Sequence, residues 1–308
     1  TAEHVVGFGT GERLHYDRLL LATGSAPRRL TTPGAELDGV RYLRTFHDAR
    51  VLANDLRSAE RVVVIGGGWI GSEVAASSRR PGTSVAIVDP GHVLLERVLG
   101  AEIGGFYTEL HQRHRVDLHL GTGVEALTGH DRVRAVHTTD GQTLAADLVV
   151  VGIGVVPRTE LAEHAGLRLD NGIVTDASLQ SSDPDVFAAG DVASAFHPLF
   201  GRHLRVEHWA NALNQGKAAA AAMLDRDVEY DRVPYFYSDQ YDVGMEYRGH
   251  AESFARVVID GDMATSEFVA YWLDDDDGVL AAMNVNVWDR GDELEAAVRA
   301  GNESAFAQ

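Results

Sequence analysis

The clearest hydrophobic pattern in the chain is an apolar run that ends in a cluster of glycines. Residues 61–77 read RVVVIGGGWIGSEVAAS, so that four aliphatic residues lead into three glycines and then into helix-forming residues. An uninterrupted aliphatic run is typical of a strand that is buried on both faces of a parallel sheet. The pattern therefore predicts a strand, a tight turn and a helix in succession.

A related pattern occurs twice. TGERLHYDRLLLATGSAPR (10–28) and DGQTLAADLVVVGIGVVPR (140–158) share Gly, Asp, Pro and Arg at a constant offset of 130 residues. Each copy predicts an outer hairpin strand, a buried parallel strand and a glycine turn. We infer that the chain contains the same supersecondary unit twice, the alternative being a chance similarity between two buried strands.

Only the second copy follows a glycine cluster. Gly66 lies 75 residues before Gly141, and a matching cluster for the first copy would lie before Thr1. We therefore expect the sequence to be a fragment that lacks the opening of its first nucleotide-binding domain.

The spacing of the glycines indicates a dinucleotide. Gly66 suits the tight turn out of the strand, and Gly68 lets a pyrophosphate approach the backbone. Gly71 allows the helix to pack close to the sheet, and the free N–H groups at the helix start face the phosphates. Trp69 and Ile70 lie inside this turn and belong to the candidate site.

Three charged residues near the turn are further candidates. Asp89 ends a second predicted strand, SVAIVD (84–89), where an acid accepts hydrogen bonds from ribose hydroxyls and repels a 2′-phosphate, which favours NAD over NADP. Arg97 is either a contact on the adenosine side or a solvated arginine. Glu73, in the first helical turn, is either an acid favoured by the helix dipole or a group near the nicotinamide.

Composition narrows the class of protein. The chain has 308 residues, enough for two or three domains, and a formal net charge of −19, which argues against nucleic acid as a partner. No apolar run approaches the length of about 20 residues that a membrane span needs. The absence of cysteine excludes disulfides and fits a reducing compartment such as the cytoplasm. We expect no metal site, because His111 and His114 share a predicted helix face without further ligands and are expected to be solvated.

Several stretches are together similar to one known family. They run in order along the chain and include YDRLLLATGSAPR (16–28), RYLRTFHDA (41–49), SSDPDVFAAGDVA (181–193), VEHWANALNQGKAAA (206–220), VPYFYSDQYD (233–242) and MNVNVWD (283–289). On these residues the chain resembles the FAD-dependent, NADH-using ferredoxin reductases of oxygenase systems.

The resemblance implies an α/β fold with two Rossmann-like domains, the first of them incomplete, and a C-terminal α+β domain. It assigns residues 1–45 and 171–230 to an FAD-binding domain, 46–170 to an NAD-binding domain and 231–308 to a C-terminal reductase domain.

The resemblance also implies which residues form the site. Beside FAD it places Thr23, Gly24, Arg44, Gly190, Asp191, Glu207, His208 and Trp209. Beside the nicotinamide it places Gly152, Ile153, Gly154 and Glu73. Three of these have a plain structural alternative: Arg44 as a surface ion pair, Asp191 as a helix cap and Trp209 as a core aromatic residue.

The implied function is electron transfer from NADH through FAD to a ferredoxin-type iron–sulfur protein by a monomer or weak homodimer. The alternatives are a monodehydroascorbate- or nitrite-reductase-like flavoprotein, or a catalytically inactive dinucleotide-binding fragment. Ferredoxins are usually acidic, so docking on this acidic chain requires a local basic patch. The segment FGRHLRVEHW (200–209) is the candidate, unless Arg202 and Arg205 neutralise the chain's own acids.

Overall fold

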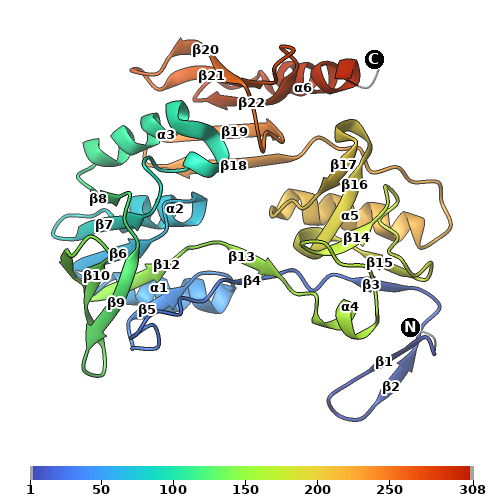
Figure 1. Ribbon diagram of the computed structural model, residues 1–308, viewed down its shortest axis with the longest axis horizontal. Coiled ribbons are helices and arrows are strands. Elements are labelled where there is room, and N and C mark those ends of the chain that lie inside the picture. The colour runs from blue at the N-terminus through green and yellow to red at the C-terminus, as the bar shows by residue number, and fades with distance from the viewer. Residues whose placement is uncertain (1–2, 306–308) are drawn as a thin grey trace.

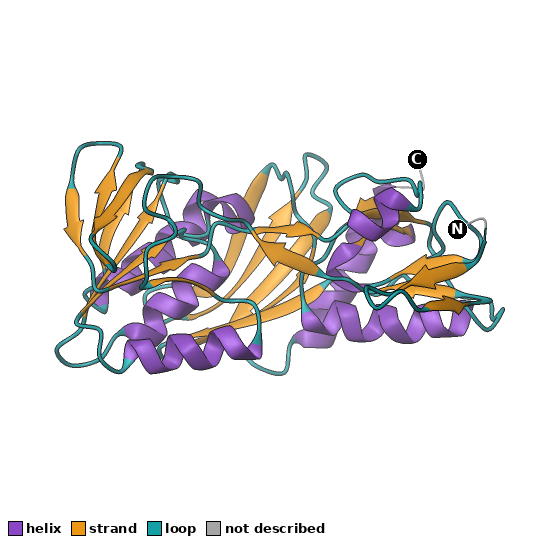
Figure 2. Ribbon diagram, turned by 90° about the horizontal axis from the view of Figure 1, so that it is seen from below, coloured by secondary structure: helices purple, strands orange, loops and turns teal. Residues whose placement is uncertain are grey.

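The computed structural model describes residues 3–305 and contains three regions, each with sheets of its own (Figure 1). Figure 2 shows that strands run through the whole length of the molecule rather than gathering in one place. Within residues 3–305, no helix is both long and apolar enough to cross a membrane.

The first region is a five-stranded parallel sheet in the order β5-β12-β6-β7-β8. Its strands are β5 (Val40–Tyr42), β12 (Leu148–Val151), β6 (Arg61–Ile65), β7 (Ser84–Asp89) and β8 (Asp117–Leu120). Three helices accompany it: α1 (Phe46–Leu56), α2 (Trp69–Ser78) and α3 (Glu96–Arg113). An antiparallel sheet of β9 (Val124–Gly129), β10 (Val133–Thr138) and β11 (Thr143–Ala145) lies in the same region. The predicted succession of strand, turn and helix is confirmed.

One strand of this sheet comes from the segment that the sequence assigned to the FAD-binding domain. β5 lies within residues 1–45, yet it pairs with β12 through Val40–Val149 and its neighbours. The parallel sheet of the first region therefore includes residues ahead of residue 46, and the domain bounds stay a prediction.

The second region holds several short strands. Its sheets pair β3 (Leu19–Leu21) with β15 (Val186–Ala188) in parallel, and β14 (Ile173–Thr175) with β16 (Ala193–His197) and β17 (Arg202–Leu204). The hairpin of β1 (Val5–Gly7) and β2 (Arg13–His15) precedes them. The helical elements are α4 (Glu160–His164), α5 (Trp209–Ala222), η1 (Gly190–Val192) and η2 (Pro198–Phe200).

The two copies of the repeat pair with each other. β4 (Ser25–Pro27) and β13 (Val155–Pro157) form an antiparallel ladder in which Ala26 faces Val156. The Arg28 N–H donates to the Gly154 oxygen and the Arg158 N–H donates to the Gly24 oxygen, both at 2.9 Å. Because each bond has its equivalent in the other copy, the ladder is locally two-fold symmetric. It links the first two regions across the middle of Figure 1.

The third region is an antiparallel sheet in the order β18-β19-β22-β21-β20 with one helix. Its elements are β18 (Tyr235–Gln240), β19 (Val243–Gly249), β20 (Arg256–Asp262), β21 (Glu267–Leu273), β22 (Val279–Val285) and α6 (Gly291–Ala305). The acidic run 274–277 forms the turn between β21 and β22, in which the Asp274 carboxylate accepts from two backbone N–H groups.

One apolar core joins the third region to the first. Phe268 of β21 packs edge-on against Phe106 of α3, and both side chains are buried. Trp272 is fully buried, and its indole Nε1–H donates to the Leu99 oxygen at 3.1 Å. Because burial of aromatic side chains dominates such contacts, this core holds the C-terminal sheet against α3 and places β18 beside α2.

Candidate functional site

The glycine turn has the geometry that its spacing predicts. Gly66 has a φ of +108°, and a Cβ atom at this position would lie 2.3 Å from the Gly152 oxygen. A Cβ atom at Gly71 would lie 1.9 Å from the Gly66 oxygen, so α2 approaches β6 as closely as backbone allows. At Gly68, by contrast, a Cβ atom would meet nothing within 4 Å, and no side chain caps the helix that begins there. The start of α2 therefore has open space beside Gly68 and no side chain that caps it.

Asp89 braces this turn. Its Oδ2 atom accepts from the Gly67 N–H at 2.6 Å, and its Oδ1 atom accepts from the Gly91 N–H at 2.7 Å. Both carboxylate oxygens are thus engaged by backbone at the carboxyl end of β7, next to the turn. Asp89 orders the loop on which any dinucleotide would rest.

A cavity of about 750 Å³ lies where the three regions meet. Among its walls are six residues that the sequence assigned to cofactors: Trp69, Ile70, Glu73, Arg97, Glu207 and His208. The first four come from the NAD side and the last two from the segment before α5. Residues assigned to two different nucleotides therefore line one space.

Glu73 is an acid of this cavity whose carboxyl pKa is displaced. Burial raises the pKa of its carboxyl group, the Ser238 hydroxyl that donates to Oε1 at 2.7 Å lowers it, and the nearby Asp239 charge raises it. The net direction is upward. A carboxyl group whose pKa is displaced by burial and that faces a cavity is a recognised mark of a functional site.

His208 and Trp209 begin α5. His208 is the N-cap residue, with Nδ1 accepting from the Ala210 N–H at 3.3 Å, and burial lowers the pKa of its imidazole. Trp209 is 59% exposed, so the alternative that it is a core residue is wrong. Its ring lies at the surface next to the cavity-lining His208.

Arg44 and Asp191 form an ion pair between regions. Arg44 Nη2 lies 2.7 Å from Asp191 Oδ2, and the Asp191 side chain is only 10% exposed. A Cβ atom at Gly24 would lie 3.4 Å from the same guanidinium nitrogen. Asp191 makes no capping hydrogen bond in η1, so it is not the helix cap that the sequence left open. The Gly190 N–H is held by the Gln215 side chain at 2.8 Å.

The remaining candidates lie along the β4–β13 ladder. The backbone of Gly152 packs against Gly66 and donates its N–H to the Ile65 oxygen at 2.8 Å. Ile153 is partly exposed beside it, and Thr23 Oγ1 donates to the Arg158 oxygen at 2.6 Å. These residues lie where the chain passes between the first and second regions, next to the β4–β13 ladder.

The basic patch at 200–209 is not free. Arg202 pairs with Glu252 at 2.7 Å. Arg205 is 12% exposed, pairs with Glu207 and donates to the Asp191 oxygen. Both arginines therefore pair with the chain's own acids, as the alternative expects, but Arg202 remains 42% exposed and the docking patch stays a prediction.

The expectation of a solvated His111 is also wrong. Its side chain is fully buried, with Nε2 2.9 Å from Gln240 Oε1 and Nδ1 3.1 Å from the Tyr241 hydroxyl. The cause is long-range, because β18 covers this face of α3 and helical spacing alone does not show it. The alternation of Ser238 and Gln240 in β18 was the available signal, since residues i and i+2 of a strand share a face.

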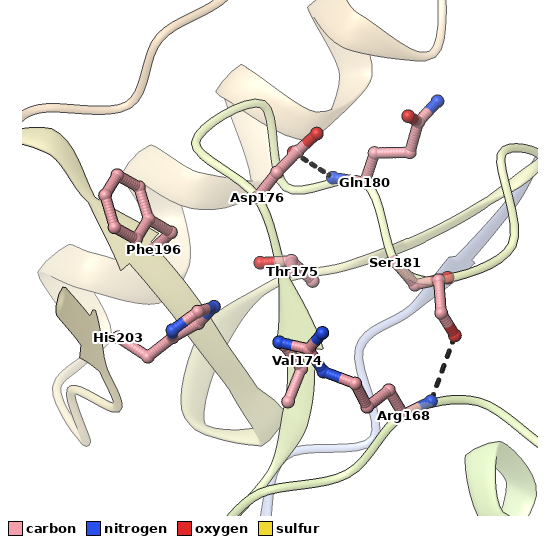
Figure 3. Close-up of a pocket in the computed structure, with 9 residues that line it drawn as sticks. Arg168, Val174, Thr175, Asp176, Gln180, Ser181, Phe196 and His203 are labelled. Atoms are coloured by element: carbon pink, nitrogen blue, oxygen red, sulfur yellow. Dashed lines mark hydrogen bonds between the residues drawn. The ribbon is translucent and has the colours of Figure 1, made fainter.

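A second pocket, of about 320 Å³, lies in the second region and shares His203 with the larger cavity. Figure 3 shows Asp176 accepting from the Gln180 backbone and Arg168 and His203 at the rim. Its lining contains none of the cofactor residues that the sequence assigned. We therefore place the candidate site at the larger cavity.

Comparison with known proteins gives two family matches. Residues 1–216 match the family described as pyridine nucleotide-disulphide oxidoreductase, and residues 235–303 match the family described as reductase C-terminal.

Individual relatives are similar over nearly the whole chain. Putidaredoxin reductase of Pseudomonas putida is 40% identical over 90% of this chain and 67% of its own length. The ferredoxin–NAD(+) reductase component of the anthranilate 1,2-dioxygenase system of Burkholderia cepacia is 41% identical over 94% of this chain and 70% of its own length. The crystal structure of the covalent putidaredoxin reductase–putidaredoxin complex matches with a TM-score of 0.91 at 37% identity, over 98% of this chain and 73% of that chain.

Proposed function

The chain belongs to the pyridine nucleotide-disulphide oxidoreductase family, among the ferredoxin reductases of oxygenase systems, and on that premise we propose that it carries electrons from NADH through FAD to a ferredoxin-type iron–sulfur protein. One observation carries this proposal: Glu73 and Trp69 from the NAD side and Glu207 and His208 from the FAD side line the same cavity. Hydride transfer requires the nicotinamide and flavin rings to meet, and a shared cavity provides that place.

The residues on the NAD side fit the dinucleotide. The space in front of Gly68 and the uncapped start of α2 suit a pyrophosphate, since backbone N–H groups at a helix N-terminus bind anions. Asp89 lies at the end of β7, where its carboxylate would accept hydrogen bonds from the ribose hydroxyls.

On the FAD side, the described residues offer contacts to part of the FAD cofactor. Asp191, next to the positive-φ residue Gly190, and its partner Arg44 supply charged groups beside the cavity-lining Arg205. Among residues 3–305, β3 has β15 as its partner on one edge and no strand on the other, so the glycine turn found beside β12 has no counterpart beside β3.

The protein itself contributes by positioning the two cofactors and enclosing the space where they would meet. When bound, NADH supplies a hydride to FAD, and the flavin passes electrons singly to the iron–sulfur partner. The α2 N-terminus would hold the pyrophosphate, and Glu73 would accept a hydrogen bond from the carboxamide. Trp69 and Phe236, packed with ring centroids 5.0 Å apart, form an apolar wall that excludes water from the cavity.

Reduction of cytochrome c tests the proposal. With NADH and a [2Fe–2S] ferredoxin, the purified chain should show flavin absorbance and should reduce cytochrome c only when the ferredoxin is present. Reduction of monodehydroascorbate without ferredoxin would support the alternative flavoprotein, and a chain that binds NADH but holds no flavin would support the inactive dinucleotide-binding fragment.

A further inference from the structure

A buried row of polar side chains runs from Glu73 into the C-terminal region. Ser238 Oγ lies 2.7 Å from Glu73 Oε1, and Gln240 Nε2 lies 3.2 Å from Ser238 Oγ. Gln240 Oε1 lies 2.9 Å from His111 Nε2, and His111 Nδ1 lies 3.1 Å from the Tyr241 hydroxyl. Four successive hydrogen bonds therefore connect α2, β18 and α3.

An ionised Glu73 fixes the direction of every bond in this row. A carboxylate only accepts, so the single Ser238 proton points to Glu73, and Ser238 in turn accepts from the Gln240 amide. The Gln240 oxygen then faces His111, which must carry its proton on Nε2 and accept from Tyr241 at Nδ1. All the donors point one way, toward the carboxylate.

The row is dry. Ser238 is 2% exposed, Gln240 1% and His111 0%. Burial also lowers the pKa of His111, which keeps its imidazole in the neutral form that this direction requires. Buried polar groups cost free energy unless they are hydrogen-bonded, and a fully connected row holds each of its members in one geometry.

We propose that Ser238, Gln240, His111 and Tyr241 are positioning residues of the nicotinamide site, which hold the Glu73 carboxylate in place through Oε1 and leave its other oxygen for the carboxamide. The inference rests on the proposed function, because it presumes that NAD occupies the cavity. It assigns to the C-terminal region a part in binding a nucleotide whose phosphates lie on a different region.

The test compares ligands with and without the nicotinamide. Calorimetry measures the binding of NAD⁺ and of ADP-ribose to the native chain and to Ser238→Ala at pH values between about 5 and 8. Ser238→Ala should weaken NAD⁺ binding about fivefold to tenfold, the effect of losing one typical hydrogen bond, and should leave ADP-ribose binding unchanged.

The pH dependence distinguishes positioning from mere stability. The Ser238 hydrogen bond favours the ionised carboxylate, so its loss raises the pKa of Glu73 further. As the pH is lowered, NAD⁺ affinity should therefore begin to fall at a higher pH in Ser238→Ala than in the native chain. Gln240→Met should shift this fall in affinity by less and Tyr241→Phe by least, since Gln240 lies two hydrogen bonds from Glu73 and Tyr241 lies four.

Ser78→Ala is the matched control. Ser78 is likewise a serine at 2% exposure whose hydroxyl donates a hydrogen bond, to the Val74 oxygen, but it lies at the far end of α2. It should leave the pH profile unaltered. An equal loss of affinity for NAD⁺ and ADP-ribose in Ser238→Ala would overturn the positioning role. So would a pH dependence of NAD⁺ affinity that is the same as in the native chain. If neither ligand binds the native chain, the proposed function itself fails.

Discussion

The two copies of the repeat adopt the same local structure in different surroundings. In both, a hairpin leads into a short parallel strand, β3 or β12, and then into a positive-φ glycine, Gly24 or Gly154. β12 has a partner on each edge, and its four residues are buried. β3 pairs with β15 alone among the described strands, and two of its three residues are half-buried.

The difference shows what a local pattern determines and what it does not. The shared Gly, Asp, Pro and Arg set the turns, because those residues act through backbone geometry and short hydrogen bonds. Burial depends on the neighbouring strands, which come from elsewhere in the chain. The same strand is therefore a core element in one copy and a one-sided element in the other.

The largest expected effect is on stability and compares the two equivalent strands, β12 and β3. Leu148 of β12 is fully buried, whereas Leu19 of β3 is half-buried. Leu148→Ala should lower the free energy of unfolding by about 2–5 kcal/mol, and Leu19→Ala by less than about 2 kcal/mol, because its site already contacts solvent. Urea denaturation measures both. Equal losses would mean that β3 is as deeply packed as β12.

The second prediction separates the packing role of the glycine turn beside β12 from its role in nucleotide binding. Gly71→Ala forces a methyl group against the Gly66 oxygen and should cost about 1–3 kcal/mol of stability together with nucleotide binding. Gly68→Ala has room for its methyl group and should cost less than about 1 kcal/mol, yet it should still weaken ADP-ribose binding. Thermal unfolding and calorimetry separate the two. Unchanged ADP-ribose affinity in Gly68→Ala would move the pyrophosphate away from this turn.

A third prediction concerns the first copy's side. Asp191→Ala leaves Arg44 without its carboxylate and should weaken FAD binding about tenfold, as expected for loss of a charged hydrogen bond. ADP-ribose binding on the other side should stay the same. The ratio of flavin to protein absorbance after gel filtration measures the first, and calorimetry the second. If Asp191→Ala retains as much flavin as the native chain, the Arg44–Asp191 ion pair has only a structural role.

The smallest effect is on the choice of nucleotide. Asp89→Asn removes the charge that opposes a 2′-phosphate, and the preference for NADH over NADPH should fall about tenfold, equivalent to ~1.4 kcal/mol. Rates with both nucleotides should drop, since an amide has one oxygen to replace the two that accept from Gly67 and Gly91. Dye reduction with each nucleotide measures the ratio. A native chain that already prefers NADPH would contradict this role of Asp89.

The sequence predicts best what depends on near neighbours. The β6–turn–α2 unit, the strand 84–89 and the repeat follow from aliphatic runs and glycines, and all are found. It fails for His111, because its partner Gln240 lies far along the chain. It also does not show that Arg205 is held by Glu207 and the Asp191 backbone, which depends on how the loop folds. Helical spacing and charge counts describe an isolated segment and contain no information on which sheet will cover it.

The β4–β13 ladder brings together the two points at which the chain passes between the first and second regions. The chain leaves the second region along β4 and returns along β13, and these two strands lie side by side with Pro27 opposite Val155. A module whose entry and exit are adjacent can be inserted or removed with little disturbance to its host. Here the ladder makes entry and exit adjacent, but the first region is also tied to the third through Phe268 and Trp272, which pack on α3, so the whole chain depends on both links.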